Sequence, residues 1–353
     1  MHSEKVFATL IISSVIISTI FQCGCTTKQI KNHTNDGKIV IGFSMDTLKE
    51  ERWYKDRDGF VADAKSLGAS VIVNIAYDSD AVQLKQVKDM LDKGIDVLVI
   101  IPYDAQNAAS CVALAKRYGV KVISYDRLVR NAGADLYISF DNEKVGELMA
   151  KTMIAAVPQG NYVIVDGPAS DYNSIMINQG IRAVLNPYIN SGKINIAKEM
   201  ATTDWMADEA SSFIQTLLKN NTKIDAVIAE NDSLAGGVIT TLSQYQMIPD
   251  VPVVGMDADL AACQRVVMNL QLMTVYKPIN QLTHTAAQFA VMMAKGEDIN
   301  VSGRISDGKY SVPYYMIEPV AVNKDNMVNT VIKDGFHMMS EVYMNIPESN
   351  WPS

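Results

Sequence analysis

The sequence predicts an α/β protein with two doubly wound parallel-sheet lobes, because one pattern of elements occurs twice, about 130 residues apart. In the first copy the apolar run 95–101 leads through a helical segment and a second apolar run to Asp126. In the second copy the run 224–229 leads in the same way to Asp257. Short apolar runs rich in β-branched residues and bounded by polar turns are typical of buried parallel strands.

The first copy belongs to a lobe that is predicted to alternate strands and helices from Lys38 onward. Its expected strands cover 38–44, 69–76, 95–101 and 120–124, and its expected helices cover 52–67, 79–93 and 105–118. Each helix ends beside a glycine, a common helix terminator, and each then leads into an apolar strand. Repeated units of this kind cross over in the right-handed sense and build a doubly wound sheet.

A second lobe is predicted to follow the short strand 137–140. Its expected helices cover 143–157, 174–190 and 207–220, and its expected strands cover 161–165, 194–200, 224–229 and 253–256. A connecting strand at 273–276 then precedes a helix that begins at Pro278, the favoured first position for proline. From Val301 we expect extended chain that returns across both lobes.

Chain crossings are expected near Phe140, Tyr276 and Tyr310, and several crossings between two lobes would form a hinge joining them. The predicted boundaries are a signal peptide at 1–25, a tether at 26–37, an N-terminal lobe from 38–142 and 277–310, a C-terminal lobe from 143–276 and 311–340, and a tail at 341–353.

The amino terminus indicates export. The apolar run 6–21 follows Lys5 and is shorter than the ~20 residues that span a bilayer, so it reads as a signal peptide. It ends at Gly24-Cys25, which is similar to a bacterial lipoprotein processing site. We therefore expect lipid on Cys25 and a periplasmic or cell-surface location. The alternative is ordinary cleavage that removes both Cys23 and Cys25.

Composition and motifs exclude several function classes. A chain of 353 residues suits about two domains, and its net charge of −8 without a basic run disfavours nucleic acid as a partner. Neither a glycine-rich phosphate motif nor a serine nucleophile elbow is present, and no CxxC or HxxxH spacing suggests a metal. We expect no cofactor, no metal and no catalytic residues, and hence a protein that is not an enzyme.

Polar and aromatic residues gather at the predicted strand ends, the edge where open parallel sheets bind ligands. The candidates are Arg52, Trp53, Asp126, Arg127, Asn173, Trp205, Asn231, Asp257 and Lys277. Carboxylates and amides accept hydrogen bonds from hydroxyls, Arg and Lys donate to them, and aromatic rings pack on the apolar faces of a pyranose, so the set suits a sugar. Each could instead be a surface charge, a cap or a core residue, but their corresponding positions in both lobes favour a cleft.

Longer strings carry a resemblance to a known family. They include Glu51-Arg52-Trp53, Tyr125-Asp126-Arg127 and the blocks 96–103, 137–148, 273–279 and 331–337. From about Lys38 to His337 the chain resembles the sugar receptors of ABC transporters within the type I periplasmic binding protein family, and among them the D-xylose receptors.

The resemblance implies a role for each candidate. Arg52, Asp126 and Arg127 would line the first lobe's side of the cleft, with Trp53 against the sugar face. The second lobe would contribute Asn173, Trp205, Asn231 and Asp257, and Lys277 would reach the sugar from just past a crossing. The chain departs from the family pattern around Asp166-Gly167-Pro168, at Tyr172 and in the setting of Trp205, which bears on sugar preference.

The resemblance further implies that the protein captures D-xylose or a close pentose, closes around it and delivers it to an ABC permease. Another monosaccharide such as glucose or ribose, or a chemoreceptor as the partner, is an alternative. A repressor effector domain would need a DNA-reading motif before Lys38, where the export signal stands. An exported sugar-converting enzyme would need a catalytic pair, and none is identifiable.

Overall fold

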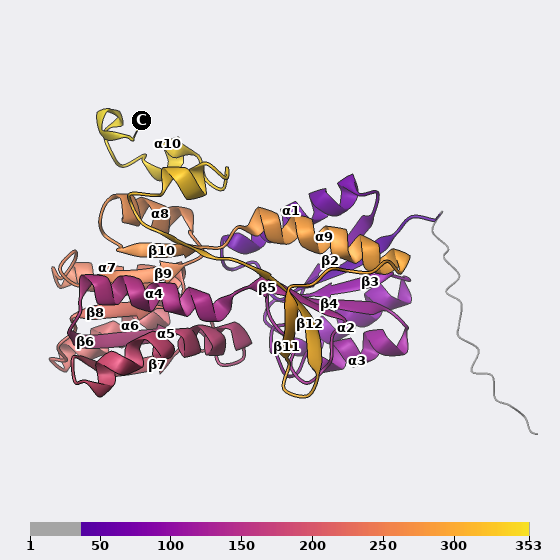
Figure 1. Ribbon diagram of the computed structural model, residues 1–353, viewed down its shortest axis with the longest axis horizontal. Helices are drawn as coiled ribbons and strands as arrows, with labels where there is room; N and C mark the ends of the chain where they lie inside the picture. Colours follow the sequence, from indigo (N-terminus) through magenta and orange to yellow (C-terminus); the bar gives the residue numbers. More distant parts are fainter. Residues whose placement is uncertain (1–36, 353) are drawn as a thin grey trace, which may run out of the picture.

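The computed structural model describes residues 37–352, which form two α/β lobes side by side (Figure 1). The sheet of the first lobe has the order β11 (Gly303–Ser306), β12 (Ser311–Ile317), β5 (Leu136–Phe140), β4 (Lys121–Tyr125), β3 (Val97–Ile100), β1 (Val40–Met45), β2 (Ser70–Ile75). The sheet of the second lobe has the order β13 (Val320–Val322), β10 (Met273–Tyr276), β9 (Val253–Met256), β8 (Ala226–Ala229), β6 (Gly160–Asp166), β7 (Ile194–Ala201).

Helices cover both faces of the first sheet. They are α1 (Arg52–Ser66), α2 (Asp80–Asp92), α3 (Ala109–Arg117) and α9 (Ile279–Lys295). One face packs against α1 and α9 through a core that includes Phe60 and Leu282, and the other packs against α2 and α3 through a core that includes Val87 and Val112. Strands covered on both faces must be apolar throughout, which explains the continuous apolar run at β3.

The second sheet is covered in the same way. Its lobe contains α4 (Asn142–Ala156), α5 (Tyr172–Asn190), α6 (Ala207–Lys219), α7 (Asp232–Gln244), α8 (Leu260–Val267) and α10 (Met339–Val342). The predicted fold class, two doubly wound α/β lobes, is confirmed. Within residues 37–352, none of the helices combines the length and the apolar character needed to cross a bilayer.

The helix predicted for 105–118 begins four residues later, at Ala109. The side chain of Asp104 accepts hydrogen bonds from the amides of Gln106 and Asn107, both at 2.8 Å. A short acidic side chain that bonds to the backbone two and three residues onward stabilises a turn in competition with a helix. The prediction therefore placed this boundary wrongly.

The third chain crossing also differs from the prediction. Tyr310 lies in the turn of the β11–β12 hairpin, where its amide donates to Asp307 Oδ1 at 2.7 Å. Strand β12 then pairs in parallel with β5 and remains in the first sheet up to Ile317, and the chain crosses only before Val320. Assigning 311–317 to the second lobe was wrong, because a hairpin turn was taken for a crossing.

The tail after β13 packs on the second lobe. Tyr343 and Trp351 contact each other with ring centroids 6.2 Å apart, and they join a cluster that contains Val331 and Phe336. Figure 1 shows this segment lying beyond α8 and β10. The predicted signal peptide, tether and lipidated Cys25 lie outside the described residues.

Helices α4 and α5 approach each other through two glycines. A Cβ atom on Gly146 would lie 2.0 Å from the carbonyl oxygen of Ile177, and one on Gly180 would lie 1.9 Å from the carbonyl oxygen of Glu143. Neither position has room for a side chain, so the two helix backbones are in direct contact.

We therefore expect Gly180→Ala to lower the free energy of unfolding by about 1–3 kcal/mol, because a methyl group must push the helices apart. Equilibrium urea unfolding measures this change. Gly236→Ala in α7 is the matched control, since its Cβ would meet only the end of the flexible Arg265 side chain, at 3.3 Å. An unchanged unfolding midpoint for Gly180→Ala would show that the helices can separate without cost.

Candidate functional site

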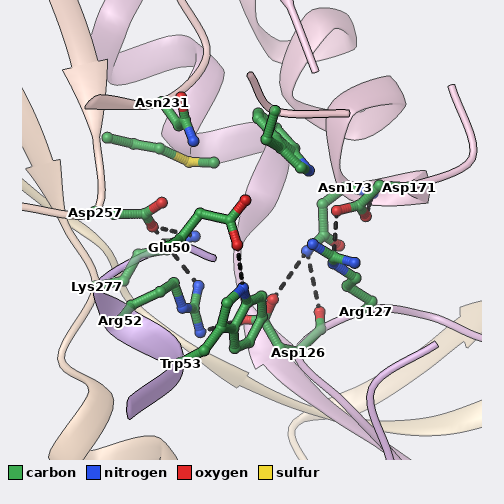
Figure 2. A pocket seen from close by; sticks show the side chains of 12 residues that line it. Glu50, Arg52, Trp53, Asp126, Arg127, Asp171, Asn173, Asn231, Asp257 and Lys277 are labelled. Carbon is green, nitrogen blue, oxygen red and sulfur yellow. Dashed lines mark hydrogen bonds and ion pairs between the residues drawn. The ribbon is translucent and has the colours of Figure 1, made fainter. Parts of the chain in front are cut away.

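All nine predicted site residues line one pocket between the lobes (Figure 2). Its remaining lining residues, which the sequence did not predict, are Glu50, Asp171 and Met256.

The pocket lies where the two copies of the repeated pattern meet. Asp126 directly follows β4 and Asp257 directly follows β9, and both have left-handed φ angles, 60° and 99°. Each amide donates to the neighbouring strand, Asp126 to the Ile138 oxygen and Asp257 to the Val275 oxygen, both at 2.8 Å. The backbone strain at equivalent positions of both lobes is typical of functional sites.

Arg52 connects carboxylates from both lobes. Its guanidinium donates to Asp126 Oδ2 at 2.7 Å and to Asp56 Oδ2 at 3.1 Å, and its Nη1 lies 3.6 Å from Asp257 Oδ1. Burial acts to raise the pKa of Asp126, but the positive charges of Arg52, Lys277 and Arg127 outweigh it and hold this pKa below its usual value. Asp126 is therefore a carboxylate that can accept hydrogen bonds.

Arg127 makes a second connection between the lobes. Its Nη1 donates to Asp46 Oδ2 at 2.6 Å, and its Nε lies 2.7 Å from Asp171 Oδ2 of the second lobe. Burial raises the pKa of Asp46 to about 7, although the Arg127 charge acts in the opposite direction. Lys277 pairs with Asp257, with Nζ 2.7 Å from Oδ1. The cations of the pocket are thus held in place by carboxylates.

The two tryptophans differ in how they are held. Trp53 packs in the core of the first lobe beside Phe60, as the alternative interpretation of this residue predicted. Its indole Nε1 also donates to Glu50 Oε2 at 2.6 Å, and the Arg52 guanidinium lies 4.4 Å from its ring centroid. Trp205 Nε1 is buried, and no described residue accepts its hydrogen bond. Trp205 therefore presents a free donor in the wall of the pocket.

The two asparagines combine structural and pocket roles. Asn173 Nδ2 donates to Asp126 Oδ1 at 3.2 Å, which links the lobes, and its Oδ1 accepts from Asn142 at 3.0 Å. Asn231 caps helix α7 by accepting from the Leu234 amide at 2.8 Å. The cap uses only the amide oxygen of Asn231, so its NH₂ group is not committed to the helix.

The three missed residues lie one or two positions before predicted ones. Glu50 lies two residues before Arg52, Met256 precedes Asp257, and Asp171 lies two residues before Asn173. In the structure Asp171 caps α5, and its side chain accepts from the Asn173 amide at 2.9 Å. Including the two residues before each predicted position would have found all three.

The lobes are closed over this pocket. Beyond the lining residues, the amide of Leu260 donates to Glu51 Oε2, Lys55 Nζ donates to the Phe336 oxygen, and the amide of Ala105 donates to the Ser170 oxygen, each at 2.9 Å across the interface. These bonds join segments of different lobes and require the closed arrangement.

The arrangement can bind a neutral ligand that carries many hydroxyl groups. The charged side chains pair with one another, so the ligand needs no net charge. Each cation can still donate a hydrogen bond to a hydroxyl group, and each carboxylate can still accept one. Within the described residues, no group of three or more His, Cys, Asp or Glu side chains is arranged to hold a metal ion.

Comparison with known proteins identifies the family. The family described as periplasmic binding protein domain matches residues 41–298. The chain is 43% identical over 326 residues to the D-xylose-binding periplasmic protein of Haemophilus influenzae, covering 92% of this chain and 96% of that protein. It is 44% identical over 328 residues to the D-xylose-binding periplasmic protein of Escherichia coli, covering 92% and 99%.

A solved structure has the same fold. The carbohydrate transporter solute binding protein of Chloroflexus aurantiacus in complex with D-glucose superposes with a TM-score of 0.82 at 27% identity, covering 86% of this chain and 98% of that one. With a family match over most of the chain and relatives above 40% identity, this chain belongs to the periplasmic binding protein family.

Proposed function

We propose that this protein is an extracytoplasmic receptor that captures one monosaccharide, D-xylose, between its lobes and delivers it to the permease of an ABC transporter. The observation that carries the proposal is the closed pocket, which both lobes line with mutually paired Arg, Lys and Asp side chains and two indoles. The relatives named for D-xylose binding support the choice of sugar.

The pocket chemistry suits a sugar because a hydroxyl group both donates and accepts. Asp126 and Asp257 offer carboxylate oxygens, and Arg127 and Lys277 offer N–H donors, at positions that their ion pairs already hold. Ligand binding then requires little ordering of these side chains, which favours affinity. The indole of Trp53 would pack against the apolar face of the ring.

The choice of D-xylose rests on similarity and size. The relatives named for D-xylose are 43% and 44% identical to this chain, whereas the structure with bound D-glucose is 27% identical. A hexose such as glucose carries an additional CH₂OH group, which the closed pocket must accommodate. Preference for glucose or ribose is the competing outcome.

The mechanism is closure and includes no reaction. A sugar that contacts Arg127 of the first lobe and Asp257 of the second stabilises the closed state over the open one, because only the closed state provides both sets of contacts. The permease would recognise the closed receptor. A chemoreceptor is an alternative partner for the same closed form.

Titration calorimetry tests the ligand. D-xylose should bind best, and D-glucose and D-ribose clearly less well. Asp257→Ala should cost about 2 kcal/mol of binding free energy or more, because Lys277 and a sugar hydroxyl lose their acceptor in a buried site. Asp58→Ala is the control, since Asp58 pairs with Arg57 on the exposed face of α1. Tight binding of another sugar without heat from D-xylose would overturn the specificity and leave the receptor role.

Small-angle scattering tests closure. Saturating D-xylose should decrease the radius of gyration, because the ligand adds contacts that exist only when the lobes meet. Buffer containing a sugar that gives no calorimetric heat is the control. A scattering profile that stays the same at saturation would rule out hinge closure as the response to ligand.

We further propose that Cys25, outside the described residues, carries lipid that anchors the receptor to the membrane. Mass spectrometry of the native protein should find a lipid-modified amino terminus at Cys25, and Cys25→Ala should release the protein from the membrane fraction. A free amino terminus beyond Cys25 would contradict this proposal.

A further inference from the structure

Gly167 does not line the pocket, but it lies against Trp205, which does. It directly follows β6, and a Cβ atom added to it would lie 2.2 Å from Cη2, 2.4 Å from Cζ2 and 2.5 Å from Cζ3 of the Trp205 indole. Gly167 is not among the glycines with a left-handed φ, so the backbone itself would accept alanine. The reason for glycine at this position is therefore the close approach of the ring.

The Gly167 peptide is fixed on its other side. Its N–H donates to Glu230 Oε2 at 2.8 Å, and the Ser174 hydroxyl lies within hydrogen-bond distance of both the Gly167 oxygen, at 3.2 Å, and Glu230 Oε2, at 2.5 Å. Burial, and then the nearby Asp166 carboxylate, raise the pKa of Glu230 well above its usual value. Glu230 is thus a fully buried acceptor that holds the Gly167 peptide in place.

The hydrogen bonds to Glu230 and Ser174 determine which group must move when a methyl group is added at Gly167. Gly167 cannot retreat without breaking its bonds to Glu230 and Ser174, so an additional methyl group must displace the Trp205 ring. That ring is 7% exposed and forms part of the pocket wall. Its outer carbons rest on Gly167, so displacing them changes the space left for a ligand.

We propose that Gly167 is a positioning residue that sets how far Trp205 extends into the pocket and thereby limits the size of the sugar that fits. The size limit rests on the proposed receptor function. The position of the ring does not, because it follows from the contacts within the protein.

A double-mutant cycle measures the coupling. Gly167→Ala should weaken D-xylose binding at least about tenfold, as expected for overpacking of a filled site, and should weaken D-glucose binding more, since the larger sugar needs more of the pocket. Trp205→Phe removes the outer indole carbons that meet the new methyl group. In the Trp205→Phe background, Gly167→Ala should therefore weaken D-xylose binding less than about threefold.

If Gly167→Ala disturbed the loop after β6 in general, it would reduce sugar affinity equally with Trp205 or with phenylalanine at that position. That result would overturn the proposal. Equal weakening of D-xylose and D-glucose would overturn the size limit. Gly236→Ala, in the same lobe, is the control and should leave both affinities unchanged.

The fluorescence of Trp205 tests the ring position without a ligand. The chain has three tryptophans, so Trp53→Phe combined with Trp351→Phe leaves Trp205 as the single emitter. Adding Gly167→Ala should shift the Trp205 emission to longer wavelength and increase its quenching by acrylamide. Unchanged emission would overturn the proposal that Gly167 sets the position of the Trp205 ring. Failure of the unaltered protein to bind any sugar would overturn the receptor function and the size limit. The emission of Trp205 would still test whether Gly167 sets the position of the ring.

Discussion

The structure depends on one constraint, the burial between two lobes of charged groups that pair both within a lobe and across the interface. Arg127 pairs with Asp46 of its own lobe and with Asp171 of the other, and both pairs are buried. An isolated buried charge is costly, and removing one partner of a buried pair is strongly destabilising. The lobes can close because each brings charges that pair with those of the other, whereas closure without these partners would bury unpaired charges.

The part of the site that the sequence could predict follows from the repeated pattern. Parallel strands that end in Asp126 and Asp257 must bring these carboxylates to the same kind of sheet edge, and the structure gives them the same backbone bond and the same unusual φ sign. All nine predicted residues line one pocket for this reason. Lys277 was predicted in the same way, because it directly follows the connecting strand 273–276, and the family resemblance added that it reaches the sugar.

The rest could not be predicted from local patterns. The Asp307–Tyr310 turn of a hairpin and a crossing between lobes both appear as polar breaks between apolar runs, and only the pairing of β12 with β5 distinguishes them. Asp171 was overlooked because its ion pair with Arg127 joins segments of different lobes, which no local pattern indicates. The role of Gly167 is invisible in the sequence, since it depends on a ring 38 positions further along the chain.

The position of the third crossing has a mechanical consequence. The chain passes between the lobes at three places, between Phe140 and Asn142, between Tyr276 and Ile279, and between Ile317 and Val320. Each connector is only a few residues long and is fixed at both ends in a strand or a helix. Three short connectors allow the lobes to bend relative to each other about one axis and restrict twisting of one lobe against the other. Under the proposed closure, the two halves of the pocket would therefore return to the same register each time.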